Sequence, residues 1–285
     1  MIQCNKYRLY SGAKNFGINV FLLSVAVTCL FPLFWMLRCS FMSLDTIFVD
    51  KSLIPPPLVF TNYITAWTKG NFGVYLLNSV IYTASVVVGI VIISSLAAYA
   101  FSRLEFPGRN FFFYMFVLAL MIPLPGSFVP LVVMMNKIGL ANTRIGYILC
   151  MINVGLSMSI LILKTFFDKM PSDLEDAARI DGCGRLLIWW HVALPLARPA
   201  IAVIVIFNSL NVWNEFILAQ LLLNDEALMP LQKGVMLFTN TNSVDYPVIM
   251  AGLVISVTPI ILVYLAMQKH IIKGLTSGTV IGESC

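Results

Sequence analysis

The feature that most constrains the fold of this sequence is a set of six long apolar stretches almost free of charge. A bilayer core about 30 Å thick is crossed by roughly 20 apolar residues in a helix, and each stretch is about that long or longer. Only the fifth contains a charge, Glu215. The stretches are residues 15–37, 70–102, 110–136, 145–163, 199–224 and 246–268. Charged residues make up 11% of the chain, against about a quarter in soluble domains, so a soluble globular fold is excluded.

The stretches predict an all-α integral membrane protein with six transmembrane helices within residues 16–268. The expected spans are about residues 16–37, 74–101, 111–135, 145–167, 199–223 and 246–268. Six crossings place the N-terminal residues 1–15 and the tail 269–285 on one side of the membrane. Gly274, Gly278 and Gly282 argue against a continuous helix in the tail. The first span is not a cleaved signal peptide, because it is too long and lacks a small-residue cleavage site.

Lysine and arginine residues predict which side is cytoplasmic. With both termini inside, twelve of the 18 lie in cytoplasmic segments and six lie outside, in agreement with the positive-inside rule. The same asymmetry accounts for the net charge of +5. We therefore expect contact with lipid and no nucleic-acid binding.

Prolines predict where helices are interrupted. Pro123, Pro125 and Pro130 lie in the third span and predict a kinked or broken helix. Such a break is tolerated in lipid only where protein or a water-filled cavity satisfies the freed backbone groups, and both a packing kink and a pore-lining break are open. Pro55, Pro56 and Pro57 exclude a span from the uncharged residues 52–68, which we expect to form a loop.

A short helix is predicted within the long cytoplasmic loop 168–198. Ser172 and Glu175 have the spacing of a capping box, and Gly182 supplies the positive φ of a helix end. On a helix from Asp173 to Ile180, Leu174, Ala177 and Ala178 share one face and Glu175, Asp176 and Arg179 point elsewhere. Two turns are unstable alone, so we expect a partner on the small-residue face. A solvated linker helix lying on its own membrane domain is the alternative.

The fifth span carries the polar side chains nearest the membrane interior. Asn208, Asn211 and Glu215 follow i, i+3, i+7 spacing and share a helical face. Together with Trp213 and Asn214 they are candidates for a substrate path, because amides and a carboxylate can form hydrogen bonds with a polar solute. An equally weighted alternative is that Glu215 anchors a partner subunit.

No catalytic or metal site is expected. The chain has no Gly-x-x-x-x-Gly-Lys-[Ser/Thr] loop for nucleotide phosphates, and its Cys and His residues lack metal-ligand spacing. We expect a non-enzymatic subunit without a cofactor. An ion-driven secondary transporter or a channel is disfavoured, since only Glu215 is ionisable within the spans and no inverted repeat is evident. A purely structural scaffold gives no reason for a cytoplasmic docking helix.

One segment resembles a known family. Residues 175–182, Glu-Asp-Ala-Ala-Arg-Ile-Asp-Gly, followed by Leu194-Pro195 and Pro199, resemble the cytoplasmic EAA loop of bacterial ABC-importer permeases. Asp176 stands where the family usually has Glu. The resemblance implies a type I permease fold and assigns these residues to contact with an ATPase subunit: Glu175, Asp176, Ala177, Ala178, Asp181, Gly182 and Pro195.

Other segments are similar to the sugar-importing, maltose-transporter branch of that family. They include residues 97–109, Met121-Ile122-Pro123, residues 139–143, residues 213–216 and residues 274–278. The resemblance implies a permease in the bacterial cytoplasmic membrane that translocates a sugar or oligosaccharide. Its implied partners are a second permease subunit, expected to be a different chain, two ATPase subunits that bind ATP, and an extracytoplasmic sugar-binding protein. A permease for another small solute is the alternative.

Overall fold

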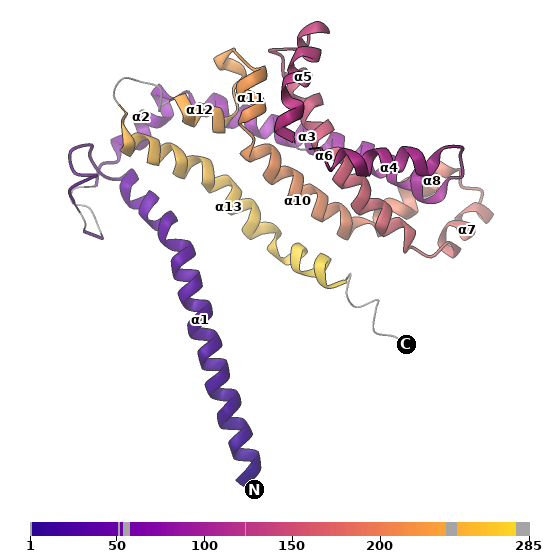
Figure 1. The fold of residues 1–285 in the computed structure, drawn as a ribbon, viewed down its shortest axis with the longest axis horizontal. Coiled ribbons are helices and arrows are strands. Elements are labelled where there is room, and N and C mark those ends of the chain that lie inside the picture. Colours follow the sequence, from indigo (N-terminus) through magenta and orange to yellow (C-terminus); the bar gives the residue numbers. More distant parts are fainter. Residues whose placement is uncertain (1, 51, 54–57, 123, 238–243, 278–285) are drawn as a thin grey trace. The chain divides into compact units, whose positions relative to one another are not determined.

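The computed structural model describes residues 2–50, 52–53, 58–122, 124–237 and 244–277, and within these ranges the regular structure is helical, without strands (Figure 1). The all-α fold class is therefore confirmed. The chain divides into two compact units, residues 1–70 with 237–257, and residues 71–236 with 258–285.

The first unit contains α1 (Ile2–Ser40), α2 (Thr61–Lys69) and the first part of α13 (Tyr246–Ser277). Large apolar side chains on α1 between Ile18 and Leu37 are exposed within this chain, as expected of a helix in contact with lipid or another subunit.

The prediction of a loop at residues 52–68 is wrong for the second half of that segment, where α2 forms. Asn62 lies on the packed face of α2 and its side-chain amide donates to the carbonyls of Ser40 at 2.9 Å and Met42 at 2.8 Å. One turn later, Ala66 is fully buried against Val248 and Ala251. The prolines exclude a span, but they do not prevent a short helix that packs on its neighbours.

The second unit is built around three helices, α3 (Phe72–Arg103), α6 (Arg144–Asp168) and α10 (Arg198–Asn214), which pack side by side (Figure 1). Gly155 on α6 lies where side chains of α3 and α10 meet α6. A Cβ atom there would be 2.2 Å from Asn208 Oδ1 and 2.5 Å from Ile90 Cδ1. The Asn208 amide donates to Ser159 Oγ at 3.1 Å. Small residues and interhelical hydrogen bonds are the usual means by which membrane helices associate.

Apart from the second part of α13, the remaining elements of this unit are short. They are α4 (Arg109–Ala119), α5 (Leu124–Lys137), α7 (Asp173–Ile180), α8 (Arg185–Ile188), the π-helical turn η1 (Trp189–Ala193), α9 (Leu194–Leu196), α11 (Ile217–Leu222), the 3₁₀ turn η2 (Glu226–Leu228) and α12 (Leu231–Leu237).

Four helical segments are long and apolar enough to cross a membrane: Gly17–Ser40, Phe72–Arg103, Arg144–Asp168 and Tyr246–Val263. They coincide with the first, second, fourth and sixth predicted spans. A fifth crossing is possible if Arg185–Leu196 and α10, which are bent by 77°, count as one span. The protein is a multi-pass membrane protein, and the six-span count with both termini cytoplasmic stays a prediction.

The other two predicted spans are divided. The third is broken between α4 and α5, which confirms the interruption expected from its prolines. The fifth is broken after Asn214, where no interruption was expected. At the C-terminal end, α13 continues through Gly274 to Ser277, so the expectation against a helix is wrong for that part of the tail. Residues 278–285, which include Gly278 and Gly282, lie outside the described residues.

We expect Gly155→Ala to lower the thermal stability of the purified protein, because the added methyl group meets Asn208 and Ile90. Overpacking costs about 1–3 kcal/mol, more than the roughly 1 kcal/mol of helix propensity that alanine gains over glycine. Thermal unfolding in detergent measures the difference.

The matched control is Gly17→Ala, since nothing lies within 4 Å of the Cβ position there. A Gly155→Ala protein that unfolds at or above the wild-type temperature would contradict the packing described.

Candidate functional site

The predicted loop helix is present with the expected bounds, as α7 (Asp173–Ile180). Gly182 has φ +83° as predicted, and Cys183 N donates to Ala178 O at 3.0 Å across the helix end. The predicted capping box is absent. Ser172 has helical dihedral angles, and its side chain makes no capping hydrogen bond, whereas the capping geometry requires an extended residue.

Glu175 is not directed away from the protein, and this corrects the predicted orientation of α7. Its side chain is buried, with the residue only 2% exposed. Its Oε1 lies 2.9 Å from Arg103 Nε, a charge contact without the alignment of a hydrogen bond. The Tyr99 hydroxyl donates to Oε2 at 3.2 Å, and Arg179 Nη2 lies 3.7 Å from the same oxygen. Glu175 therefore fastens α7 to the end of α3.

Arg103 is the last residue of α3, and its surroundings join three elements. Its guanidinium also donates to the carbonyl of Met170, just before α7. Next to it, Ser102 Oγ donates to Asp168 Oδ1 at 2.7 Å, and Lys164 Nζ donates to the other oxygen of Asp168 at 2.7 Å. The end of α3 is thus tied to the end of α6 as well as to α7.

The opposite face of α7 is open. Ile180 is 87% exposed and Leu174 44% exposed, although both are large and apolar. Exposed apolar side chains continue along the following turns at Leu186, Leu187 and Trp190. An uncovered apolar surface of this kind marks an interaction site.

The residues that the family resemblance assigns to ATPase contact do not all lie on this open face. Glu175 is buried and Ala178 is half-buried against the core of the second unit. The others are exposed: Asp176, Ala177, Asp181, Gly182 and Pro195. Asp176 accepts a hydrogen bond from Arg179 at 2.8 Å on the exposed side. Reasoning from the sequence did not include Tyr99 and Arg103, which complete the site.

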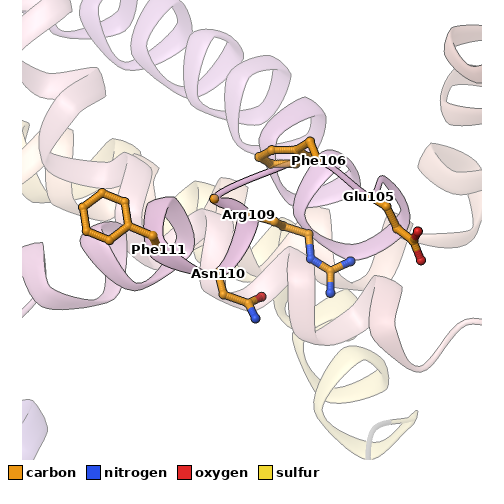
Figure 2. Close-up of a pocket in the computed structure, with 6 residues that line it drawn as sticks. Glu105, Phe106, Arg109, Asn110 and Phe111 are labelled. Atoms are coloured by element: carbon orange, nitrogen blue, oxygen red, sulfur yellow. The ribbon is translucent and has the colours of Figure 1, made fainter.

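The turn between α3 and α4 directly follows Arg103 and lines an open surface pocket of about 350 Å³ (Figure 2). Gly108 has φ +81°, a conformation that a side chain would strain. Arg109 Nη1 donates to the Leu104 carbonyl at 3.4 Å. Figure 2 shows Arg109 and Phe111 extending in different directions from the start of α4. This turn sets the direction in which α4 leaves the end of α3.

The polar residues of the fifth span do not share one surface. Asn208 is buried between helices, whereas Asn211 and Asn214 are exposed. Trp213 is buried and lines an apolar cavity of about 380 Å³ between α3, α10 and the second part of α13. Val80, Val87 and Pro259 also line this cavity. Glu215 lies beyond the end of α10. A substrate-path role for these residues stays a prediction.

Comparison with known proteins identifies the family. The family described as the binding-protein-dependent transport system inner membrane component matches residues 89–277. The chain belongs to this family. The importer permease inferred from the EAA segment is thereby confirmed.

Relatives extend over nearly the whole length of the chain. The diacetylchitobiose uptake system permease protein NgcG of Streptomyces coelicolor is 35% identical over 92% of this chain and 87% of its own. The trehalose/maltose transport system permease protein MalG of Thermococcus litoralis is 35% identical over 91% and 94%. The crystal structure of a bacterial ABC transporter involved in alginate import contains a similar chain, with TM-score 0.80, 27% identity and coverage of 90% and 96%. The type I permease fold is confirmed.

We expect Glu175→Gln to destabilise this permease, because it leaves the Arg103 guanidinium without its counter-charge. Loss of a charged partner at a mostly buried site costs about 1–3 kcal/mol, which lowers the unfolding temperature by several degrees. Thermal unfolding of the purified chain measures the loss.

Asp176→Asn is the control, since it removes the neighbouring carboxylate from an exposed ion pair of small energetic value. Equal unfolding temperatures for Glu175→Gln and Asp176→Asn would show that Glu175 is not the fastening residue.

Proposed function

We propose that this permease is one membrane subunit of an ATP-driven importer in the bacterial cytoplasmic membrane, and that it translocates a sugar or oligosaccharide. The named relatives carry diacetylchitobiose, trehalose or maltose, and the similar solved structure carries alginate. The complete importer would contain a second, different permease, two ATPase subunits that bind all the ATP, and an extracytoplasmic binding protein that delivers the sugar.

The observation that carries this proposal is the two-sided environment of α7. One side is fixed by the Arg103–Glu175 ion pair to the end of a 32-residue helix. The other side presents Leu174, Ala177 and Ile180 to the surroundings. A helix held rigidly on one face and uncovered on the other is suited to pass the movement of a docked ATPase subunit to the membrane helices.

Uptake measurements test the substrate class. Membrane vesicles that contain the whole importer, the binding protein and ATP should accumulate a labelled sugar or oligosaccharide from a panel of neutral, amino and acidic sugars. Accumulation of a different small solute, with no sugar transported, would contradict the proposed sugar substrate but not the proposed importer function. ATP-independent accumulation driven by an ion gradient would overturn the importer assignment.

We expect Ala177→Trp to abolish or strongly reduce uptake, because a bulky side chain on the open face of α7 prevents the close approach of an ATPase subunit. The measurement is ATP-dependent uptake together with co-purification of the ATPase subunits. Ala119→Trp makes the same change at an exposed alanine on α4 and serves as the control. Normal uptake and normal ATPase association in the Ala177→Trp importer would refute α7 as the docking helix.

We expect Asn211→Ala to raise the sugar concentration needed for half-maximal uptake if the exposed amide lines the sugar path. Loss of a neutral hydrogen bond corresponds to about a threefold to tenfold change. Uptake kinetics at several sugar concentrations provide the measurement. Unchanged kinetics for every transported sugar would remove Asn211 from the path.

A further inference from the structure

The break in the fifth span has an unusual cause. The break in the third predicted span occurs in a sequence with Pro123, Pro125 and Gly126, which interrupt helices. Residues 210–222, by contrast, contain neither proline nor glycine. Nevertheless α10 ends at Asn214 and α11 begins at Ile217, and Glu215 between them has an extended backbone with φ −72° and ψ 128°. The residue types around the break therefore do not by themselves interrupt the helix.

The Glu215 side chain supplies hydrogen-bond acceptors that the broken helix lacks. Its Oε1 accepts a hydrogen bond from Leu218 N at 2.6 Å, and its Oε2 accepts one from Ala219 N at 3.2 Å. In an uninterrupted helix these two N–H groups would bond to the carbonyls of residues 214 and 215, four positions earlier. The carboxylate therefore takes the place of two backbone acceptors, and the same N–H groups have partners in either form.

A second contact fixes the position of the carboxylate. The hydroxyl of Tyr147, in the first turn of α6, donates to Glu215 Oε2 at 3.2 Å. Tyr147 is fully buried, and its ring packs on Tyr82 of α3 with 4.8 Å between centroids. Glu215 is thus joined to both α11 and α6 within its own chain.

The far end of α11 is joined to the same region. Asn142 N, just before α6, donates to the Leu222 carbonyl at 3.0 Å. The side-chain oxygen of Asn142 accepts hydrogen bonds from Asn224 N at 2.8 Å and Asp225 N at 3.0 Å. Both ends of α11 are therefore held against the start of α6 by hydrogen bonds. Hydrogen bonds of this kind can break and re-form.

We propose that Glu215 is a positioning residue for transport, which with Tyr147 holds the fifth span broken and α11 against the start of α6. Release of the carboxylate during the transport cycle lets α10 and α11 join into one helix and moves α11 away from α6. This role rests on the proposed importer function. It differs from both sequence-based interpretations of Glu215, because both carboxylate oxygens accept hydrogen bonds from groups of this chain.

The first test measures where α11 lies, independently of transport. Cysteines are placed at Ala141 and Asn224, whose side chains take no part in these contacts, in a background without native cysteines. A short, reducible thiol cross-linker bridges them in membranes that contain the assembled importer. Glu215→Ala should lower the ratio of cross-linked to uncross-linked protein about fivefold, the change in the ratio of docked to released α11 that loss of a helix-capping side chain produces. Tyr147→Phe should lower it in the same direction, and Glu215→Gln, which keeps an acceptor oxygen, should restore part of the yield.

The control for the first test is Gln220→Ala, an exposed position on α11 with no part in these contacts. It should leave the yield unchanged. An unchanged yield in Glu215→Ala would overturn the positioning role of Glu215.

The second test asks whether α11 must move. Cross-linking residues 141 and 224 should stop sugar uptake, and reduction of the cross-link should restore it, while single-cysteine proteins treated in the same way keep their uptake. Glu215→Ala should lower the maximal uptake rate several-fold at unchanged half-saturating sugar concentration and normal assembly. Full uptake by the cross-linked importer would overturn the proposed release, whereas absence of sugar uptake before cross-linking would contradict the proposed function instead.

Discussion

The arrangement of α7 depends on one buried charge. A helix of two turns has little stability of its own, and a carboxylate taken out of water is costly unless it is paired and hydrogen-bonded. Glu175 meets this requirement only where Arg103 and the Tyr99 hydroxyl lie, at the end of α3. Because the charged side must face α3, the apolar side with Leu174 and Ile180 must face outward. A polar contact thereby determines which surface of α7 is free to bind a partner.

The helix that receives this contact extends across the second unit. α3 has 32 residues, about 48 Å of helix. Near its middle, Ile90 packs against Gly155 of α6, which also contacts Asn208 of α10. Near its other end, Asn78 donates to the carbonyls of Ala227 and Met229, at 2.8 and 3.0 Å, and Tyr82 packs on Tyr147 beside Glu215. A displacement of α7 can therefore reach the region of the broken fifth span through one continuous helix.

Much of this architecture follows from the sequence because membrane helices leave a strong signal, the absence of charge over about 20 residues. The bounds of α7 were also predictable, since acidic residues begin it and Gly182 ends it. The interactions between elements were not. The direction of Glu175 depends on Arg103, 72 positions earlier in the chain, and the break at Glu215 depends on Tyr147, 68 positions earlier. Helical periodicity describes one element at a time, so it assigned Glu175 to solvent and continued the fifth span through Glu215. The helix α2 was missed for the same reason, because its polar Asn62 donates to carbonyls at the end of α1 and just beyond it.

Photo-cross-linking from the open face of α7 tests most directly whether this face meets the ATPase. A photoreactive amino acid at Ile180, which is 87% exposed, is compared with the same amino acid at Ile138, an exposed isoleucine between α5 and α6. In an assembled importer that hydrolyses ATP, we predict that position 180 captures an ATPase subunit and position 138 does not. Capture of lipid alone at position 180, or equal capture of the ATPase from both positions, would contradict the account.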